Sequence, residues 1–101
     1  MTTLIVLFNL KNPQQREAYE QWAREVDLPT VGALPSIEKF EVLRAAGVLG
    51  GGESPYQYVE ILRVRDMQQL GADIATPTMQ QVSTRFQAFA DAPLFIVTES
   101  L

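Results

Sequence analysis

TLIVLFNL, residues 3–10, decides the fold, because this uncharged run of aliphatic, β-branched and aromatic side chains predicts a buried strand at the start of the chain. The residues that follow are typical of a helix start. Asn12 is expected to be the N-cap, Pro13 the first helical residue and Gln15 the capping-box partner. A strand and then a helix therefore open the chain.

The first helix is expected to bury one face, because apolar side chains recur along it at helical spacing. Pro29 disfavours helical geometry at Leu28, so the helix is expected to end there. Residues 32–35 contain Gly and Pro and predict a turn-rich connection. The residues expected on the buried face are Tyr19, Trp22, Ala23 and Val26.

A β-hairpin is expected in the middle of the chain. Residues 37–45 and 56–64 have strand-like patterns, and the loop between them contains the glycine run 50–52. Side chains alternate along a strand, so each strand of this hairpin has two distinct faces. In the first of them, one face is expected to carry Phe40, Val42 and Arg44, and the other Ile37, Lys39, Glu41 and Leu43.

The last third of the chain predicts two helices and a strand. Asp66 is expected to cap a short helix, and Thr76-Pro77 to start a longer one. The final strand is expected at residues 94–98, directly after Pro93. The apolar stripe of the longer helix consists of Met79, Val82, Phe86 and Phe89.

The predicted element order is therefore β-α-β-β-α-β, which is the pattern of a ferredoxin-like α+β fold. A four-stranded antiparallel sheet with two helices on one face satisfies this order. A chain of 101 residues lies in the usual size range of one domain, so residues 1–101 are expected to form a single one.

Both faces of the predicted sheet are apolar, although helices cover only one of them. In the first strand Val6 and Phe8 point one way, while Ile5 and Leu7 point the other. A bare apolar face of this size is unusual for a monomer, and a second copy of the chain could cover it. We therefore expect a homodimer, paired face to face as an α/β barrel. The alternative is a loop that folds over the bare face.

The composition excludes several function classes. Cysteine and histidine are absent, which removes thiolate nucleophiles, Ser-His arrangements and the commonest ligands of transition metals and haem. The net charge of −4 makes nucleic acid and anionic membranes poor partners. The apolar N-terminal run is too short to span a bilayer. A cytoplasmic protein with no cofactor and no metal is expected, although carboxylates alone leave a Mg²⁺ site open.

Several segments together form a pattern found in a known family: FNL at 8–10, YEQWA at 19–23, DLPTV at 27–31 with LPS at 34–36, YQYVE at 56–60, and GADIATP at 71–77. Over nearly its full length the chain resembles the REDY-like proteins of the HapK type. The resemblance implies a dimeric α/β barrel, related to antibiotic-biosynthesis monooxygenases and muconolactone isomerase-like proteins. It also implies a link to the biosynthesis of prodiginine pigments and related bisindole compounds, and hence a small aromatic ligand rather than a defined reaction.

Polar side chains on the strands predict a pocket between the sheet and the helices, near the dimer seam. Tyr58 and Glu60 lie two residues apart on one strand and point the same way. Arg44 on the neighbouring strand could approach them, depending on the register. Asn9 interrupts an apolar strand and needs hydrogen-bond partners. With Trp22 as an apolar wall, this set has the composition of a small-molecule site.

Without histidine, acid–base chemistry falls to carboxyls or a phenol. Glu60 or Asp73 would act with a pKa raised by burial, and Tyr58 as a proton donor. Arg44 could stabilise a developing negative charge. Glu60 and Tyr58 are therefore the candidate catalytic residues, and Asn9, Trp22, Arg44 and Asp73 the candidate ligand-binding residues.

Each candidate also has a purely structural interpretation. Trp22 lies on a core-facing helical stripe, and Tyr58 suits packing at a dimer interface. Glu60 and Arg44 suit a cross-strand ion pair, and Asp73 with Thr76 suits the cap of the last helix. The glycine run predicts a hairpin tip, since it lacks the Lys and the following helix of a phosphate-binding loop.

The leading hypothesis is a cofactor-independent enzyme or accessory protein of bacterial secondary metabolism. It would act on a small, flat, apolar aromatic compound or an oxidised pyrrole or indole, by proton transfer or by guiding a reactive intermediate to one product while water is kept out. Two alternatives remain open. One is a dimer that binds a small hydrophobic ligand without chemistry, and the other is a plain dimeric interaction protein.

Overall fold

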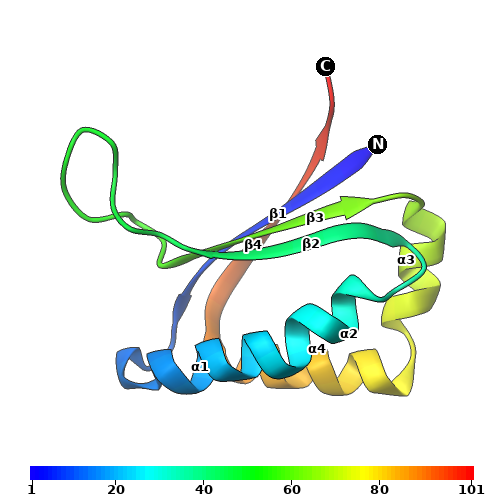
Figure 1. The fold of residues 1–101 in the computed structure, drawn as a ribbon, viewed down its shortest axis with the longest axis horizontal. Coiled ribbons are helices and arrows are strands. Elements are labelled where there is room, and N and C mark those ends of the chain that lie inside the picture. The colour runs from blue at the N-terminus through cyan, green and yellow to red at the C-terminus, as the bar shows by residue number, and fades with distance from the viewer.

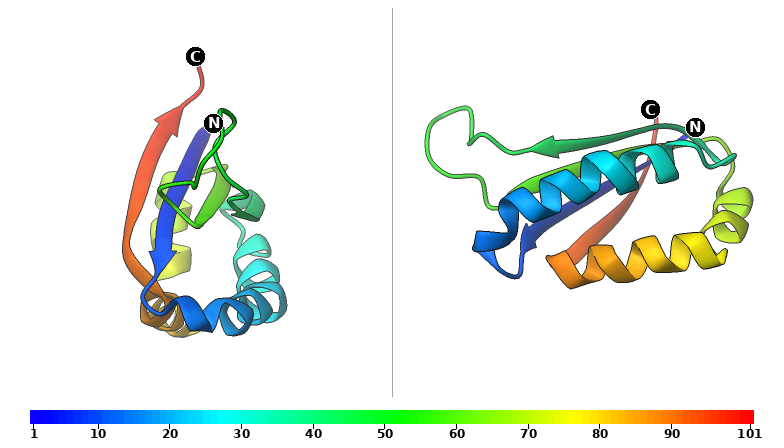
Figure 2. Two further views of the ribbon diagram at one scale, coloured as in Figure 1. Left: turned by 90° about the vertical axis from the view of Figure 1, so that its left-hand side faces the viewer. Right: turned by 60° about the horizontal axis from the view of Figure 1, so that its bottom comes forward.

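The computed structural model describes residues 1–101, and the chain follows the expected order of strands and helices (Figure 1). The strands form one antiparallel sheet in the order β2-β3-β1-β4, with the helices on one of its faces (Figure 2). The ferredoxin-like α+β prediction is confirmed. The strands are β1 (Thr2–Leu10), β2 (Ile37–Arg44), β3 (Tyr58–Val64) and β4 (Ala90–Glu99). The helical elements are η1 (Pro13–Gln15), α1 (Arg16–Trp22), η2 (Ala23–Asp27), α2 (Leu28–Gly32), α3 (Met67–Ile74) and α4 (Pro77–Phe89).

The first helical region does not end before Pro29, so this part of the prediction is wrong. It begins as expected at Asn12, whose side chain accepts a hydrogen bond from the backbone N–H of Gln14. It then runs through α1, the π-helical turn η2 and α2. In the π turn the N–H of Leu28 donates to the carbonyl of Ala23, five residues earlier. Pro29 has no N–H and would crowd a carbonyl in a regular turn, so the wider turn lets the helix continue.

Irregular strand pairing changes two further details. Ile37 was expected to share a face with Lys39 and Glu41, but it is buried in the core because the register of β2 and β3 shifts between Ile37 and Lys39. Strand β4 begins at Ala90 rather than after Pro93. Its pairing with β1 shifts near Ala92, which has a left-handed φ of 42°. Proline is tolerated in β4 because this strand lies at the edge of the sheet.

The core lies between the sheet and the helices and consists of two clusters. In the aromatic cluster, Phe8 is fully buried and contacts Tyr19, Tyr58 and Phe86 at ring-centroid distances of 5.5, 5.4 and 5.0 Å. The predicted apolar stripe of α4 is buried and contributes to both clusters. The second, largely aliphatic cluster consists of Val31, Ile37, Val64, Leu70, Met79 and Val82.

Apolar side chains stay uncovered in the single chain, as the pattern of the first strand predicted. On β4, Phe95 and Val97 are 62% and 64% exposed although they point to the helix side of the sheet. On the opposite face no helix packs against the sheet (Figure 2). The apolar side chains on that face are Ile5, Leu7, Leu43, Val59, Ile61, Leu94 and Ile96.

Phe8→Ala is expected to lower the free energy of unfolding by about 3–5 kcal/mol, because it removes a fully buried ring that contacts three others. Urea unfolding followed by circular dichroism measures the change. Leu49→Ala in the β2–β3 loop is the matched control, since a fully exposed side chain should change stability by less than about 0.5 kcal/mol. Equal losses in the two variants would contradict the assignment of the core.

Candidate functional site

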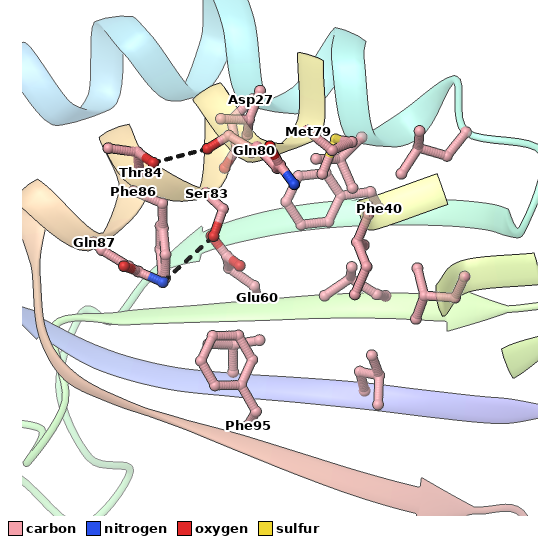
Figure 3. Close-up of a pocket in the computed structure, with 18 residues that line it drawn as sticks. Asp27, Phe40, Glu60, Met79, Gln80, Ser83, Thr84, Phe86, Gln87 and Phe95 are labelled. Carbon is pink, nitrogen blue, oxygen red and sulfur yellow. Dashed lines mark hydrogen bonds between the residues drawn. The ribbon is translucent and has the colours of Figure 1, made fainter. Parts of the chain in front are cut away.

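A pocket of about 560 Å³ lies between the helix-facing side of the sheet and the helices (Figure 3). This volume suits a small organic molecule. Of the 18 residues that line it, 12 are hydrophobic. None of residues 45–57 is among them, so the glycine-rich loop is not part of the wall. The polar lining residues are Asp27, Glu60, Gln80, Ser83, Thr84 and Gln87.

One wall of the pocket includes Glu60, Val6 and Phe95, which belong to a row of side chains that crosses the sheet. Val42, Glu60, Val6 and Phe95 are consecutive partners in the registers of β2, β3, β1 and β4. Glu60 is 6% exposed, and it is the one carboxyl in an otherwise apolar row. Figure 3 shows it pointing from β3 toward Ser83 on α4. Because Phe95 lines the pocket and is 62% exposed, the pocket opens to solvent beside β4.

The π-helical turn η2 brings a second carboxyl to the pocket. Asp27 follows Tyr19 and Ala23 at intervals of four residues, and all three side chains are buried. Asp27 is 4% exposed and lines the pocket. No hydrogen bond from the chain reaches its carboxyl, which does not serve as a helix cap. The turn that carries the helix past Pro29 therefore also supplies an unpartnered acid.

The environment raises the pKa of both carboxyls toward neutrality. Burial, and then the charge of Asp27, raises the pKa of Glu60 to about 8, against the opposite effect of a hydrogen bond from Tyr19. That bond is long, with 3.5 Å between the Tyr19 hydroxyl and Oε2 of Glu60. Burial raises the pKa of Asp27 to about 7. Both groups can therefore gain and lose a proton near neutral pH, as acid–base chemistry requires.

The structure does not bring Arg44 to Glu60. The register pairs Arg44 with Tyr58, and Glu60 with Val42. The Arg44 guanidinium instead donates to both carboxylate oxygens of Glu20, at 2.9 and 2.6 Å. The alternative of a Glu60–Arg44 ion pair is therefore wrong, and no positively charged side chain lines the pocket.

Tyr58 belongs to the same network as Arg44. Its hydroxyl donates to Oε2 of Glu20 at 2.7 Å, in a separate cleft of about 230 Å³. The hydrogen bond from Arg44 is the main reason that the pKa of Glu20 falls to about 2. Burial, and then its bond to Glu20, raises the pKa of Tyr58 to about 12. The Tyr58 ring still packs edge-on against Tyr19, at 4.8 Å, and so supports the residue that reaches Glu60.

Asn9 connects β1 to the segment just before β3 and does not line the pocket. Its amide nitrogen donates to the carbonyl of Pro55 at 3.1 Å, and its Oδ1 accepts from the N–H of Gln57 at 2.9 Å. These bonds hold the chain just before β3, which begins at Tyr58 rather than at Tyr56 as predicted.

Trp22 and Asp73 also lie outside the pocket wall. Trp22 packs against two aromatic rings of the core, with centroids 6.2 and 5.7 Å away. Asp73 accepts hydrogen bonds from the backbone N–H of Ser36 at 3.0 Å and from Gln69 at 2.7 Å. The contacts with Ser36 and then Gln69 hold the pKa of Asp73 below its usual range. In the expected cap of α4, the Thr76 hydroxyl accepts from the N–H of Met79, and it donates to the backbone carbonyl of Asp73 rather than to its carboxylate.

Asp27 is the site residue that sequence reasoning missed. The signal was present, because an acidic residue four positions after Ala23 falls on the buried stripe of the helix. The expected helix end at Leu28 hid it, and Val26 was assigned to the stripe instead. Val26 is 38% exposed.

Two further features bear on the class of site. The chain contains no group of three or more His, Cys, Asp or Glu side chains placed to hold a metal ion. None of its helices combines the length and hydrophobicity needed to cross a membrane.

The fold and the pocket define a class: a ferredoxin-like α+β protein with an apolar pocket that contains two buried carboxyls. Residues 2–101 match the family model described as REDY-like protein HapK, and the chain belongs to this family. The resemblance found in the sequence is thus confirmed. A search of curated proteins finds no match.

Solved structures agree with the family and the fold. HapK from Hahella chejuensis is 32% identical, with a TM-score of 0.81 over 100% of this chain and 93% of that one. A Dabb family protein with a ferredoxin-like fold from Mesorhizobium loti is 17% identical, with a TM-score of 0.76 over 99% and 96% of the two chains. An antibiotic biosynthesis monooxygenase is 14% identical, with a TM-score of 0.79 over 100% and 99%. The last two likenesses concern the fold alone.

Glu60→Gln and Asp27→Asn are each expected to flatten the pH dependence of stability. The folded pKa values of about 8 and 7 lie above the ordinary values of 4.5 and 3.8, so the folded state retains protons that the unfolded state loses. This contribution to stability is fully present below about pH 4 and is lost as the pH rises to about 8. Each amide should remove a loss on the order of 4 kcal/mol, measured by urea unfolding across that pH range.

Glu38→Gln, on the exposed surface of β2, removes a carboxyl of the same type outside the pocket and should leave the wild-type profile unchanged. If neither pocket variant altered the profile more than Glu38→Gln does, the raised pKa values would be refuted.

Proposed function

We propose that this protein works in the cytoplasm on a small, flat, largely apolar aromatic compound of bacterial secondary metabolism, and that Glu60 transfers a proton to or from it. The observation that carries the proposal is a buried carboxyl with a pKa near 8 in an apolar pocket of about 560 Å³. Membership of the HapK family supports a role in secondary metabolism. The finer expectation is a prodiginine-like or bisindole-like pathway, in line with the sequence resemblance.

The roles in proton transfer follow from the contacts. Glu60 is the acid–base group, because its carboxyl lines the pocket and its pKa lies near the working pH. Tyr19 donates a long hydrogen bond to one oxygen of Glu60 and lies beside it. Tyr58 acts as a positioning residue, through its ring contact with Tyr19. The hydrophobic walls keep water away from a reactive intermediate.

A second candidate function is binding without turnover. The hydrophobic majority of the lining favours it, since such walls hold a ligand but offer few groups that react.

The proposal includes a homodimer. Apolar side chains on β4 and on the face without helices are uncovered in one chain, and Phe95 leaves the pocket open at the same edge. A second copy packed on the face without helices would bury the apolar side chains there, and its contact along the β4 edge would also cover Phe95 and close the pocket. A plain interaction dimer would use the same surface without any ligand.

Ile96→Glu is expected to shift the protein from dimer to monomer, because it places a charge on the bare apolar face at an edge strand. Analytical ultracentrifugation at micromolar concentration measures the mass. Gln68→Glu on the exposed surface of α3 is the matched control for added charge and should remain dimeric. A wild-type mass equal to one chain would refute the homodimer.

The proton-transfer step can be tested with 2-methylindole, a flat nitrogen aromatic whose C3 hydrogen exchanges with solvent by protonation. Wild-type protein should accelerate deuterium exchange at C3, followed by proton NMR. Glu60→Gln should abolish at least about 90% of this acceleration while still binding 2-methylindole, because the amide cannot transfer the proton. Tyr58→Phe should retain most of it. Binding without acceleration in the wild type would favour the non-catalytic function, and absence of binding would contradict the proposal.

A further inference from the structure

The pocket contains acidic side chains but no basic ones. Asp27 and Glu60 are its only lining residues that can carry a charge, and both are acids. Arg44, the cation expected near Glu60, is held by Glu20 in the separate cleft. The remaining polar lining comes from neutral amides and hydroxyls of α4, drawn on the wall opposite Glu60 in Figure 3. Any charge-based recognition in this pocket therefore favours a positive ligand.

The two acids also lack partners in the chain. Asp27 accepts no hydrogen bond, and Glu60 accepts only the long one from Tyr19. Buried polar groups are normally satisfied, so unpartnered ones that line a pocket indicate groups available to a ligand.

Asp73 shows what a structural carboxylate looks like in this same chain. Asp73 and Asp27 are 7% and 4% exposed as whole residues, but burial is the main influence on the pKa of Asp27 only. Asp73 accepts hydrogen bonds from Ser36 and Gln69 and lies outside the pocket wall. The fold therefore satisfies a buried acid where the acid has a structural role, and it leaves Asp27 and Glu60 without such partners.

We propose that the ligand of this pocket carries a positive charge when bound, as a protonated nitrogen aromatic or an iminium, and that Asp27 and Glu60 together recognise that charge. The inference rests on the proposed function, because it specifies the ligand class of the same pocket. The proton balance is simple. If a neutral aromatic is protonated in the pocket, Glu60 gives up the proton, the ligand becomes the cation, and the new carboxylate neutralises it. If the ligand arrives as a cation, one proton leaves the pair for solvent.

Binding of a cation should therefore depend on pH. The titratable groups that face Glu60 are Tyr19 from α1 and Asp27 from η2, and α4 presents only neutral groups. Burial raises the pKa of Tyr19 above its ordinary value, so Tyr19 stays protonated over the whole of this pH range. The affinity for a cation should then rise as the two acids ionise between about pH 6 and 9, while the affinity for a neutral aromatic should not.

Two probes of nearly the same shape separate charge from shape: the permanent cation N-methylquinolinium and the neutral 1-methylnaphthalene. At about pH 9, fluorescence titration should show wild-type protein binding the cation about tenfold or more tightly than the neutral probe. At about pH 6 the preference should shrink, and calorimetry in two buffers of different ionisation enthalpy should detect proton release on binding of the cation. The Asp27→Asn/Glu60→Gln double variant should lose the preference and still bind 1-methylnaphthalene. Glu38→Gln should keep the preference.

The outcomes separate this inference from the function on which it rests. Equal affinity for the two probes in wild-type protein at every pH would overturn the cation preference and leave a ligand-binding pocket in place. Binding of neither probe would overturn both. Because the pH series uses wild-type protein, the test stands even if the double variant fails to fold.

Discussion

Glu60 is a carboxyl in the middle of an apolar sheet face, and the organisation of the fold follows from the need to accommodate it. Burial of an ionised carboxylate without a cation costs several kcal/mol, and a protonated carboxyl avoids most of that cost. The chain places no Arg or Lys beside Glu60 and instead brings up Asp27 through the π-helical turn. Two acids without a counter-charge are unfavourable for stability, and burial of the aromatic cluster around Phe8 acts in the opposite direction.

A tyrosine hydroxyl donates to a glutamate at two places in the protein, and the pKa of the glutamate shifts in opposite directions at these two places. Glu20 accepts hydrogen bonds from Tyr58 and from three arginines, and the strongest of these effects, that of Arg44, lowers its pKa to about 2. Glu60 accepts only the long bond from Tyr19, and its pKa rises to about 8. The two tyrosine rings touch, so these environments are separated by little more than one aromatic contact. One network is structural and permanently ionised, and the other can change its protonation near neutral pH.

Sequence patterns predicted the element order, the apolar stripe of α4 and the side of β3 on which Glu60 lies, because these depend on local periodicity. They did not predict the partner of Arg44, because the strand register depends on contacts distant in the sequence. The predicted end of the first helix, at Leu28, was wrong for a different reason. Proline usually terminates a helix, and the π turn that accommodates Pro29 has no reliable local signature. Missing this turn also meant missing Asp27, and with it the second half of the candidate site.

The raised pKa of Glu60 is the central claim, and carbon-13 NMR of side-chain carboxyls in uniformly labelled protein tests it most directly. Titration of the Glu60 carboxyl resonance, assigned by its loss in Glu60→Gln, should give a midpoint near 8, and Asp27→Asn should lower it because the neighbouring charge is removed. A midpoint close to the ordinary value of 4.5 would mean that Glu60 is ionised and solvated at neutral pH. The account of a buried acid pair would then be contradicted.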